Sequence, residues 1–145
     1  MKVIQNIIGG LAGALALNIL HESVRRVYQD APRVDLVGEE ALTKIAESAG
    51  TEPPKGDKLY AATLAGDILS NALYYSVIGT SKKKNLLATG LVTGLAAGVG
   101  AVTLTKPLGL SDAPVTRTDK TKALTVAWYT LGGVVAALTI KALRK

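Results

Sequence analysis

A stripe of polar side chains runs along one face of an otherwise apolar segment. The stripe comprises Tyr60, Thr63, Asp67, Ser70, Asn71 and Tyr74. Residues three and four apart share a helix face, so this spacing predicts one polar face with Asp67 at its centre. An ionised aspartate near the middle of a membrane helix costs about 2.5–3.5 kcal/mol on insertion scales. We therefore expect this face to meet protein or water rather than lipid, and Asp67 is the candidate group for binding a proton or an ion.

A second polar group closes the first apolar segment. Its members are Asn18, His21, Glu22 and Arg25, again at spacings of three and four, and Lys106 ends a later apolar segment. Near Asp67, these groups would form a partly dry site in which the pKa values of carboxylates and imidazole shift. The spacing leaves open whether His21 and Asp67 meet. The plainer alternatives are a structural hydrogen bond for Asp67 and a histidine at the level of the lipid headgroups.

The composition excludes several kinds of chemistry. With no cysteine and one histidine, the chain has no disulfide, no thiolate nucleophile and no multi-histidine metal site. The stretch HESVRR begins like a zinc-protease helix but lacks the second histidine, and no phosphate-binding loop or nucleophile elbow occurs. We expect no metal and no cofactor. Enzymatic activity would be limited to a lipid-headgroup reaction that uses His21, Glu22 and the nearby arginines.

Four apolar runs are available to position these groups. The 145 residues are 48% hydrophobic and 19% charged, and the charges cluster between the runs. The runs cover residues 3–20, 59–79, 86–105 and 123–142, and each has about the 20 residues needed to cross a hydrocarbon core. A soluble bundle would instead carry a charged face on every helix. The sequence therefore predicts an all-α integral membrane bundle of four transmembrane helices, which forms a single domain over residues 1–145.

The polar segment 21–58 separates the first two runs. Asp35 is a candidate N-cap for a short amphipathic helix through Ala49, which would lie on the membrane or fold back over the bundle. The first run could also be read as a signal peptide, since GALAL resembles a cleavage site. Its single flanking lysine favours retention as a helix.

Small residues mark the faces by which the helices are expected to pack. The candidate packing positions are Gly9, Gly13, Gly90, Gly94, Gly98, Gly132 and Gly133. Glycines four residues apart let another backbone approach closely. We favour packing within one bundle. The alternative is that the third run makes an oligomer contact or lines a pore.

The charge pattern favours a membrane rather than a nucleic acid as partner. The net charge is +6, but the basic residues lie in four short polar segments rather than on one face, as expected for interface anchors. Ten Lys and Arg residues fall on one side of the four runs and seven on the other. The raw count favours an N-out orientation, whereas the density of charge near the membrane favours N-in and C-in, which we adopt.

The segment LLATGLVTGLAAGVGAVTLTKPLGLSDAP, from Leu86 to Pro114, resembles the later helices of small multi-helix bacterial inner-membrane proteins of uncharacterised families. The resemblance covers about the last 60 residues and implies an inner-membrane location, but it carries over no functional residue. Our leading functional hypothesis is a structural or accessory subunit that packs through its Gly-rich helices, in a homo-oligomer or with a membrane-protein partner. The alternative is a small channel or transporter for ions, protons or solutes centred on Asp67. The third is the lipid-headgroup enzyme.

Overall fold

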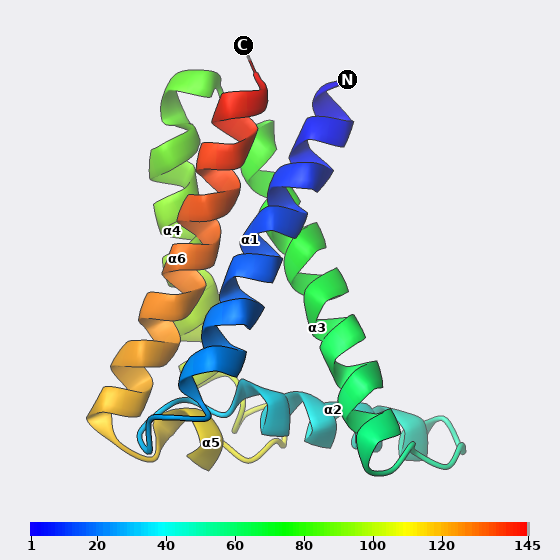
Figure 1. Ribbon diagram of the computed structural model, residues 1–145. Coiled ribbons are helices and arrows are strands. Elements are labelled where there is room, and N and C mark those ends of the chain that lie inside the picture. Colours follow the sequence, from blue (N-terminus) through cyan, green and yellow to red (C-terminus); the bar gives the residue numbers. More distant parts are fainter. Residues whose placement is uncertain (145) are drawn as a thin grey trace.

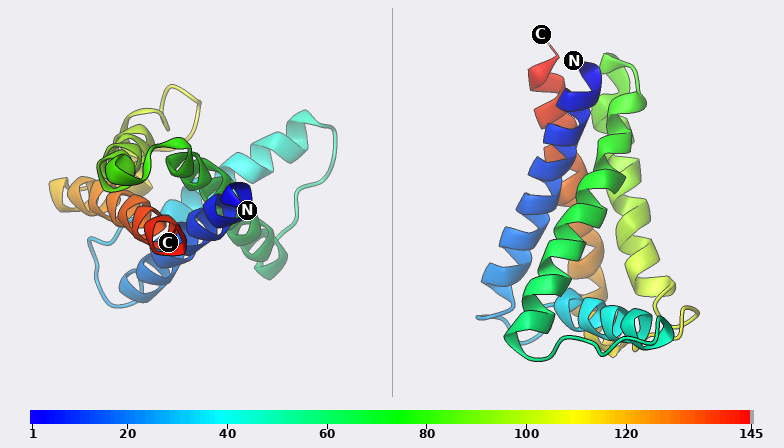
Figure 2. Two further views of the ribbon diagram at one scale, coloured as in Figure 1. Left: turned by 90° about the horizontal axis from the view of Figure 1, so that it is seen from above. Right: turned by 90° about the vertical axis from the view of Figure 1, so that its right-hand side faces the viewer.

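The computed structural model describes residues 1–144, and these form helices without any strand (Figure 1). The elements are α1 (Lys2–Val24), α2 (Val34–Ser48), α3 (Asp57–Ser76), η1 (Val77–Thr80), η2 (Lys83–Asn85), α4 (Leu86–Thr103), α5 (Ala113–Thr116) and α6 (Asp119–Leu143). Four long helices run side by side, and α2 crosses one end of them (Figures 1 and 2). The prediction of an all-α chain is confirmed.

Three helices are long and apolar enough to cross a membrane. They are α1, the stretch Lys83–Thr103 that contains α4, and α6. The fourth expected span, α3, is not among them. Its 20 residues include Asp57, Lys58 and Asp67, and these lower its hydropathy.

Glycines allow α4 and α6 to lie with their backbones in contact. A Cβ atom added to Gly94 would lie 2.7 Å from the Thr130 Cα and from the Tyr129 oxygen, and one on Gly98 would lie 2.6 Å from the Val126 Cα. Gly90 faces Gly133 in the same way. The third run therefore turns its small face toward the last helix of its own chain.

Close contacts at glycine also join α1 to its neighbours. Gly13 faces Gly132, while Gly9 faces Ile140 at the end of α6. Gly10, which lies outside the predicted packing positions, lies directly against the α3 backbone at Ala72 and Ser76. Helix α1 is therefore held between α3 and α6 along its first half.

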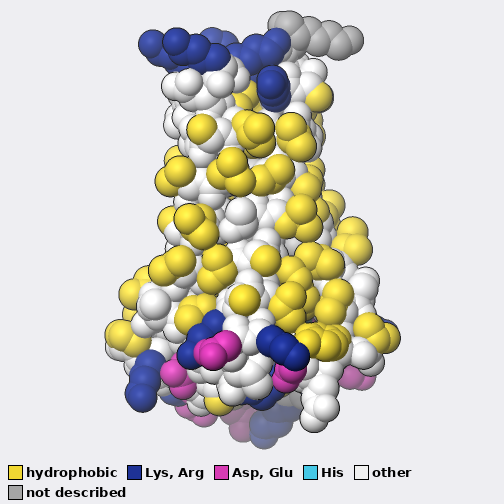
Figure 3. Space-filling view, turned by 90° about the vertical axis from the view of Figure 1, so that its left-hand side faces the viewer, with side chains coloured by type: hydrophobic (Ala, Val, Ile, Leu, Met, Phe, Trp, Pro, Cys, Tyr) yellow, Lys and Arg dark blue, Asp and Glu magenta, His cyan; other side chains and the backbone are white. Residues whose placement is uncertain are grey.

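The two ends of the bundle carry different charges. Figure 3 shows Lys and Arg at one end, an apolar belt along the helices, and Lys and Arg mixed with Asp and Glu at the other end. The belt includes exposed Ile7, Leu11, Leu91 and Leu95. A charged surface at each end with an apolar belt between them is typical of a protein that spans a bilayer. We call the two surfaces the cationic end and the mixed end; α2 and α5 lie at the mixed end.

Helix α2 is tied to the loop that leads into α6. The Arg33 backbone NH donates to the Pro114 oxygen at 2.9 Å, and the Ser111 NH donates to Glu40 Oε2 at 2.9 Å. The Lys44 ammonium donates to the Gly109 oxygen. Of the two arrangements expected for this helix, the structure has the one in which it folds back over the bundle.

Candidate functional site

A polar cavity lies where α1, α2 and α3 meet at the mixed end. Helix α1 contributes Asn18, His21 and Glu22, α2 contributes Asp35, and α3 contributes Tyr60, Thr63 and Asp67. The cavity measures about 30 Å³, which is enough for at least one water molecule. Carboxylates from three helices and the one histidine therefore share a single small space, which α2 covers.

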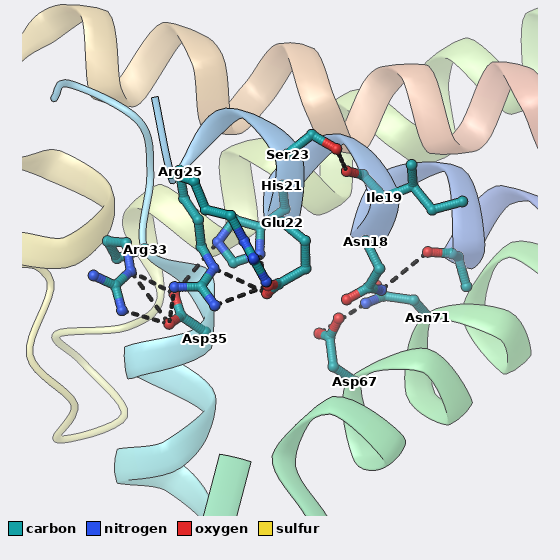
Figure 4. Close-up of polar contacts among 12 residues, drawn as sticks. Asn18, Ile19, His21, Glu22, Ser23, Arg25, Arg33, Asp35, Asp67 and Asn71 are labelled. Carbon is teal, nitrogen blue, oxygen red and sulfur yellow. Dashed lines mark hydrogen bonds and ion pairs between the residues drawn. The ribbon is translucent and has the colours of Figure 1, made fainter. Parts of the chain in front are cut away.

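His21 occupies the centre of this arrangement (Figure 4). Its side chain is 6% exposed; Nδ1 lies 3.6 Å from Glu22 Oε1 and Nε2 lies 3.3 Å from Asp35 Oδ1. The ring also packs edge-on against Trp128, with 5.9 Å between centroids. Among the described residues Nε2 has no well-directed hydrogen bond. The imidazole thus lies between two proton acceptors in a nearly water-free space.

Asp35 joins the cavity to the basic residues around it. Its side chain is 7% exposed and lies 2.6 Å from the Arg33 guanidinium and 3.7 Å from that of Arg25. Burial alone would raise the pKa of Asp35, but the close approach of His21 and the hydrogen bonds from Arg33 outweigh burial and hold this pKa well below its usual range. Asp35 is therefore a carboxylate that stays ionised although it is buried.

The prediction that Asp35 caps α2 is wrong. The helix begins at Val34, so Asp35 already lies in its first turn, and the N-cap position is Arg33. Its carboxylate turns toward Arg33 and His21 instead of accepting a backbone NH. Asp35 is therefore a residue of the site and not the cap of a helix. Its partner His21 lies on another helix, so the spacing of residues along the chain cannot predict the pair.

Glu22 lines the cavity, and Arg25 is paired with it. The Arg25 side chain donates to both Glu22 oxygens, at 3.0 and 2.8 Å, and its guanidinium lies 5.7 Å from the centre of the Tyr60 ring. The hydrogen bond to Glu22 raises the pKa of Arg25 above its usual value, which keeps the guanidinium charged. Arg26 adds a weaker contact with Glu22 at 3.5 Å. These pairs fix the carboxylate of Glu22 beside His21.

Asp67 approaches the cavity from α3. Asn71 donates to its Oδ1 at 2.9 Å, and Asn18 lies beside it on α1 (Figure 4). Thr63, one turn earlier, is buried, and its hydroxyl has no partner among the described residues. Asp67 and His21 line the same cavity. The sequence left their proximity open, and the structure brings them together.

The remaining candidates lie elsewhere. The Ser70 hydroxyl donates to the Asp67 backbone oxygen at 3.1 Å, and the Tyr74 hydroxyl donates to the Thr93 oxygen at 2.9 Å; both side chains are exposed. Lys106 lies in an exposed turn after α4 and does not line the cavity. The polar stripe of α3 therefore divides into an inward half around Asp67 and an outward half that faces α4.

The cavity brings together side chains that can accept or donate protons rather than a set of metal ligands. Among residues 1–144, no three His, Asp or Glu side chains are arranged to hold a metal ion. His21, on which the lipid-headgroup reaction would depend, is 5% exposed, and that reaction stays a prediction. Comparison of the chain with protein-family models, with curated proteins and with solved structures found no match.

Proposed function

We propose that the chain is a small integral membrane protein with four spans that binds and moves protons or small cations through Asp67. The direction of the helices supports the fourth span. Both α1 and α4 run from the cationic end to the mixed end, so a chain that crosses the bilayer with both must return between them (Figure 1). Helix α3 is the element that makes this return. Its polar residues Thr63, Asp67 and Asn71 face the bundle, while Leu69 and Leu73 remain exposed for lipid.

The observation that carries the functional proposal is the shared cavity of Asp67 and His21. Ionisable groups within membrane segments are costly and rare, and substrate or ion pathways and proton relays are among the functions that they mark. Here Asp67 lines the same cavity as an imidazole that lies 3.6 Å from Glu22 and 3.3 Å from Asp35. Such a chain of donors and acceptors can take up a proton at the mixed end and hold it at the depth of Asp67.

Passage across the whole membrane requires a change of shape. Beyond Asn71, toward the cationic end, Gly10 lies directly against Ala72 and Ser76, so α1 and α3 leave no room between them. We therefore expect α3 to move away from α1 during transport. Its contact with α4 is limited enough to leave an open groove between these two helices, and this favours such movement.

Replacing Asp67 with asparagine tests this function. In proteoliposomes loaded with a pH-sensitive dye, or with a cation-sensitive dye, the wild type should show proton or cation flux. Asp67→Asn should lower the rate by tenfold or more, because the amide carries no charge and cannot bind a proton. The matched control is Asp57→Asn, which removes an exposed charge from the same helix and should leave the rate unchanged. The proposal is wrong if wild-type vesicles show no flux for any tested ion.

The groove between α3 and α4 supports a second candidate function, that of an accessory subunit. It measures about 470 Å³ and is lined on α3 by Ser70, Asn71 and Tyr74, and on α4 by Ala96, Ala97, Gly100 and Leu104. Small residues let another helix approach closely, and exposed Ser70 can bond across such a contact. A helix of a membrane partner or of a second copy fits this groove.

Filling the groove tests the accessory function. Ala96→Leu places a bulky side chain in the groove, whereas Ala88→Leu makes the same change at an exposed position of α4 outside it. We expect the wild type and Ala88→Leu to purify in mild detergent with a stoichiometric partner or as an oligomer, and Ala96→Leu to lose it. A monodisperse monomer in all three samples would count against this candidate.

The proposed location is the bacterial inner membrane, as the resemblance of the last helices implies, with both chain ends in the cytoplasm. The orientation is supported by the density of basic residues at the cationic end, which the positive-inside rule places on the cytoplasmic side. Because the chain has no cysteine, single cysteines at Thr80 and Glu52 can be labelled with a membrane-impermeant maleimide in intact cells. Labelling of Thr80→Cys without labelling of Glu52→Cys would show that the protein has the opposite orientation.

A further inference from the structure

A hollow opens at the cationic end, which is the opposite end of the bundle from the polar cavity. It measures about 690 Å³ and lies between the start of α1, the loop 79–83 and the end of α6. Its polar and charged side chains come from Lys2, Gln5, Thr80, Ser81, Lys82, Lys83 and Arg144. Segments from the beginning, middle and end of the chain thus converge on one basic hollow.

Among residues 1–144, the basic side chains of this end have no Asp or Glu neighbour. Lys2, Lys82, Lys83, Lys84, Lys141 and Arg144 lie here, whereas the acidic residues of the chain lie at the mixed end or in the polar cavity. Within residues 1–144 every ion pair is formed by His21, Arg25, Arg26, Arg33, Lys44 or Lys122, all remote from this hollow. The described side chains therefore leave a concentrated positive charge at this end without a compensating Asp or Glu.

Arg144 gives the hollow a fixed wall. Its guanidinium donates to Asn6 Oδ1 at 2.7 Å and to the Ser81 oxygen at 3.1 Å, and it also donates to the Gly79 oxygen. Gln5 adds a bond of 2.9 Å to the Leu143 oxygen. The Arg144 Nε is buried and has no acceptor in the described part of the chain. These bonds join α1, η1 and α6, so the positive charge of Arg144 is held in place rather than on a freely moving side chain.

The hollow lies at the level where lipid headgroups would be. Exposed Ile4 follows Lys2 on α1, and exposed Leu87 follows Lys84 at the start of α4, so the apolar belt begins within one turn of the basic residues. We propose that this hollow binds the phosphate of an anionic phospholipid, with Lys2, Lys82 and Lys83 as its main contacts and the acyl chains lying along the belt. The proposal rests on the bilayer-spanning arrangement but not on ion movement through Asp67.

Lipid retention provides the test. The protein is placed in nanodiscs made from equal amounts of phosphatidylglycerol and phosphatidylcholine, extracted in mild detergent and weighed with its bound lipids by native mass spectrometry. We expect the wild type to retain phosphatidylglycerol over phosphatidylcholine. A basic residue near an anionic surface changes binding by about fivefold. The ratio of retained phosphatidylglycerol to phosphatidylcholine should therefore fall at least tenfold in the triple variant Lys2→Gln, Lys82→Gln, Lys83→Gln.

A matched control separates a site from general charge attraction. The triple variant Lys55→Gln, Lys58→Gln, Lys120→Gln removes the same charge from exposed positions at the mixed end, and it should keep the preference of the wild type. Equal losses in both triple variants, or no preference in the wild type, would overturn the proposal. So would displacement of phosphatidylglycerol by inorganic phosphate at millimolar concentration, because the site would then hold a soluble anion. Failure to enter nanodiscs at all would instead contradict the membrane-spanning arrangement.

Discussion

Replacing Gly94 with alanine should destabilise the bundle by about 2 kcal/mol, within the usual range for overpacking. The added Cβ would lie 2.7 Å from both the Thr130 Cα and the Tyr129 oxygen. Both of these are backbone atoms of α6, so neither can move aside by changing a rotamer. The two helices must separate, and the contact along the glycine face of α4 weakens.

The matched control is Gly66→Ala in α3, where an added Cβ has nothing within 4 Å. Alanine is the better helix former by about 1 kcal/mol, so this variant should be as stable as the wild type or more stable. The measurement is thermal unfolding in detergent, followed by circular dichroism. If Gly94→Ala matched Gly66→Ala, close contact between α4 and α6 would not be what stabilises the protein.

Replacing Asp35 with asparagine should have the largest effect on the polar site. Removal of one partner from a buried ion pair typically costs about 3–5 kcal/mol, because the remaining charges stay buried without compensation. Here the remaining charged groups are Arg25 and Arg33. We expect α2 to detach from the bundle, which limited proteolysis between residues 26 and 56 would detect as faster cleavage. Glu47→Gln, an exposed change on the same helix, should leave the cleavage rate unchanged.

Acid should reproduce the effect of Asp35→Asn in the wild type. The folded state lowers the pKa of Asp35, so its ion pairs contribute their full stability above the pKa of the unfolded carboxyl, about 3.9. That contribution falls as the pH decreases below this value toward the lower folded pKa. Cleavage of the wild type should therefore accelerate in acid and approach the rate of Asp35→Asn, whereas the rate of the variant should depend less on pH. A variant with the same acid response as the wild type would exclude Asp35 as the responsible group.

Periodic patterns in the sequence predicted the helices and one half of the site. Apolar runs with charges between them gave the long helices, and the spacing of Thr63, Asp67 and Asn71 predicted the inward face of α3. The other half depends on α2 folding back, which no local pattern determines. For that reason the local sequence predicts a helix cap at Asp35, and it predicts that Lys106 lies near Asp67, which the structure does not show.

The glycine spacing behaved in a similar way. It predicted that α4 has a face suited to close contact, but the partner of that face depends on the order of helices around the bundle. In the structure the partner is α6 of the same chain, with Gly133 opposite Gly90. The four-residue spacing does not predict the contact of Gly10, because Gly10 follows Gly9 directly and lies on a different face of α1, where it meets α3.

Both described chain ends lie at the cationic end (Figure 2). Two copies can therefore be concatenated by a linker from residue 144 of the first copy to residue 1 of the second, without an additional crossing of the bilayer. In such a tandem, Asp67→Asn can be placed in one copy alone. If each copy works independently, the singly mutated tandem should retain half of the flux, and if the copies work only as a pair it should lose nearly all of it.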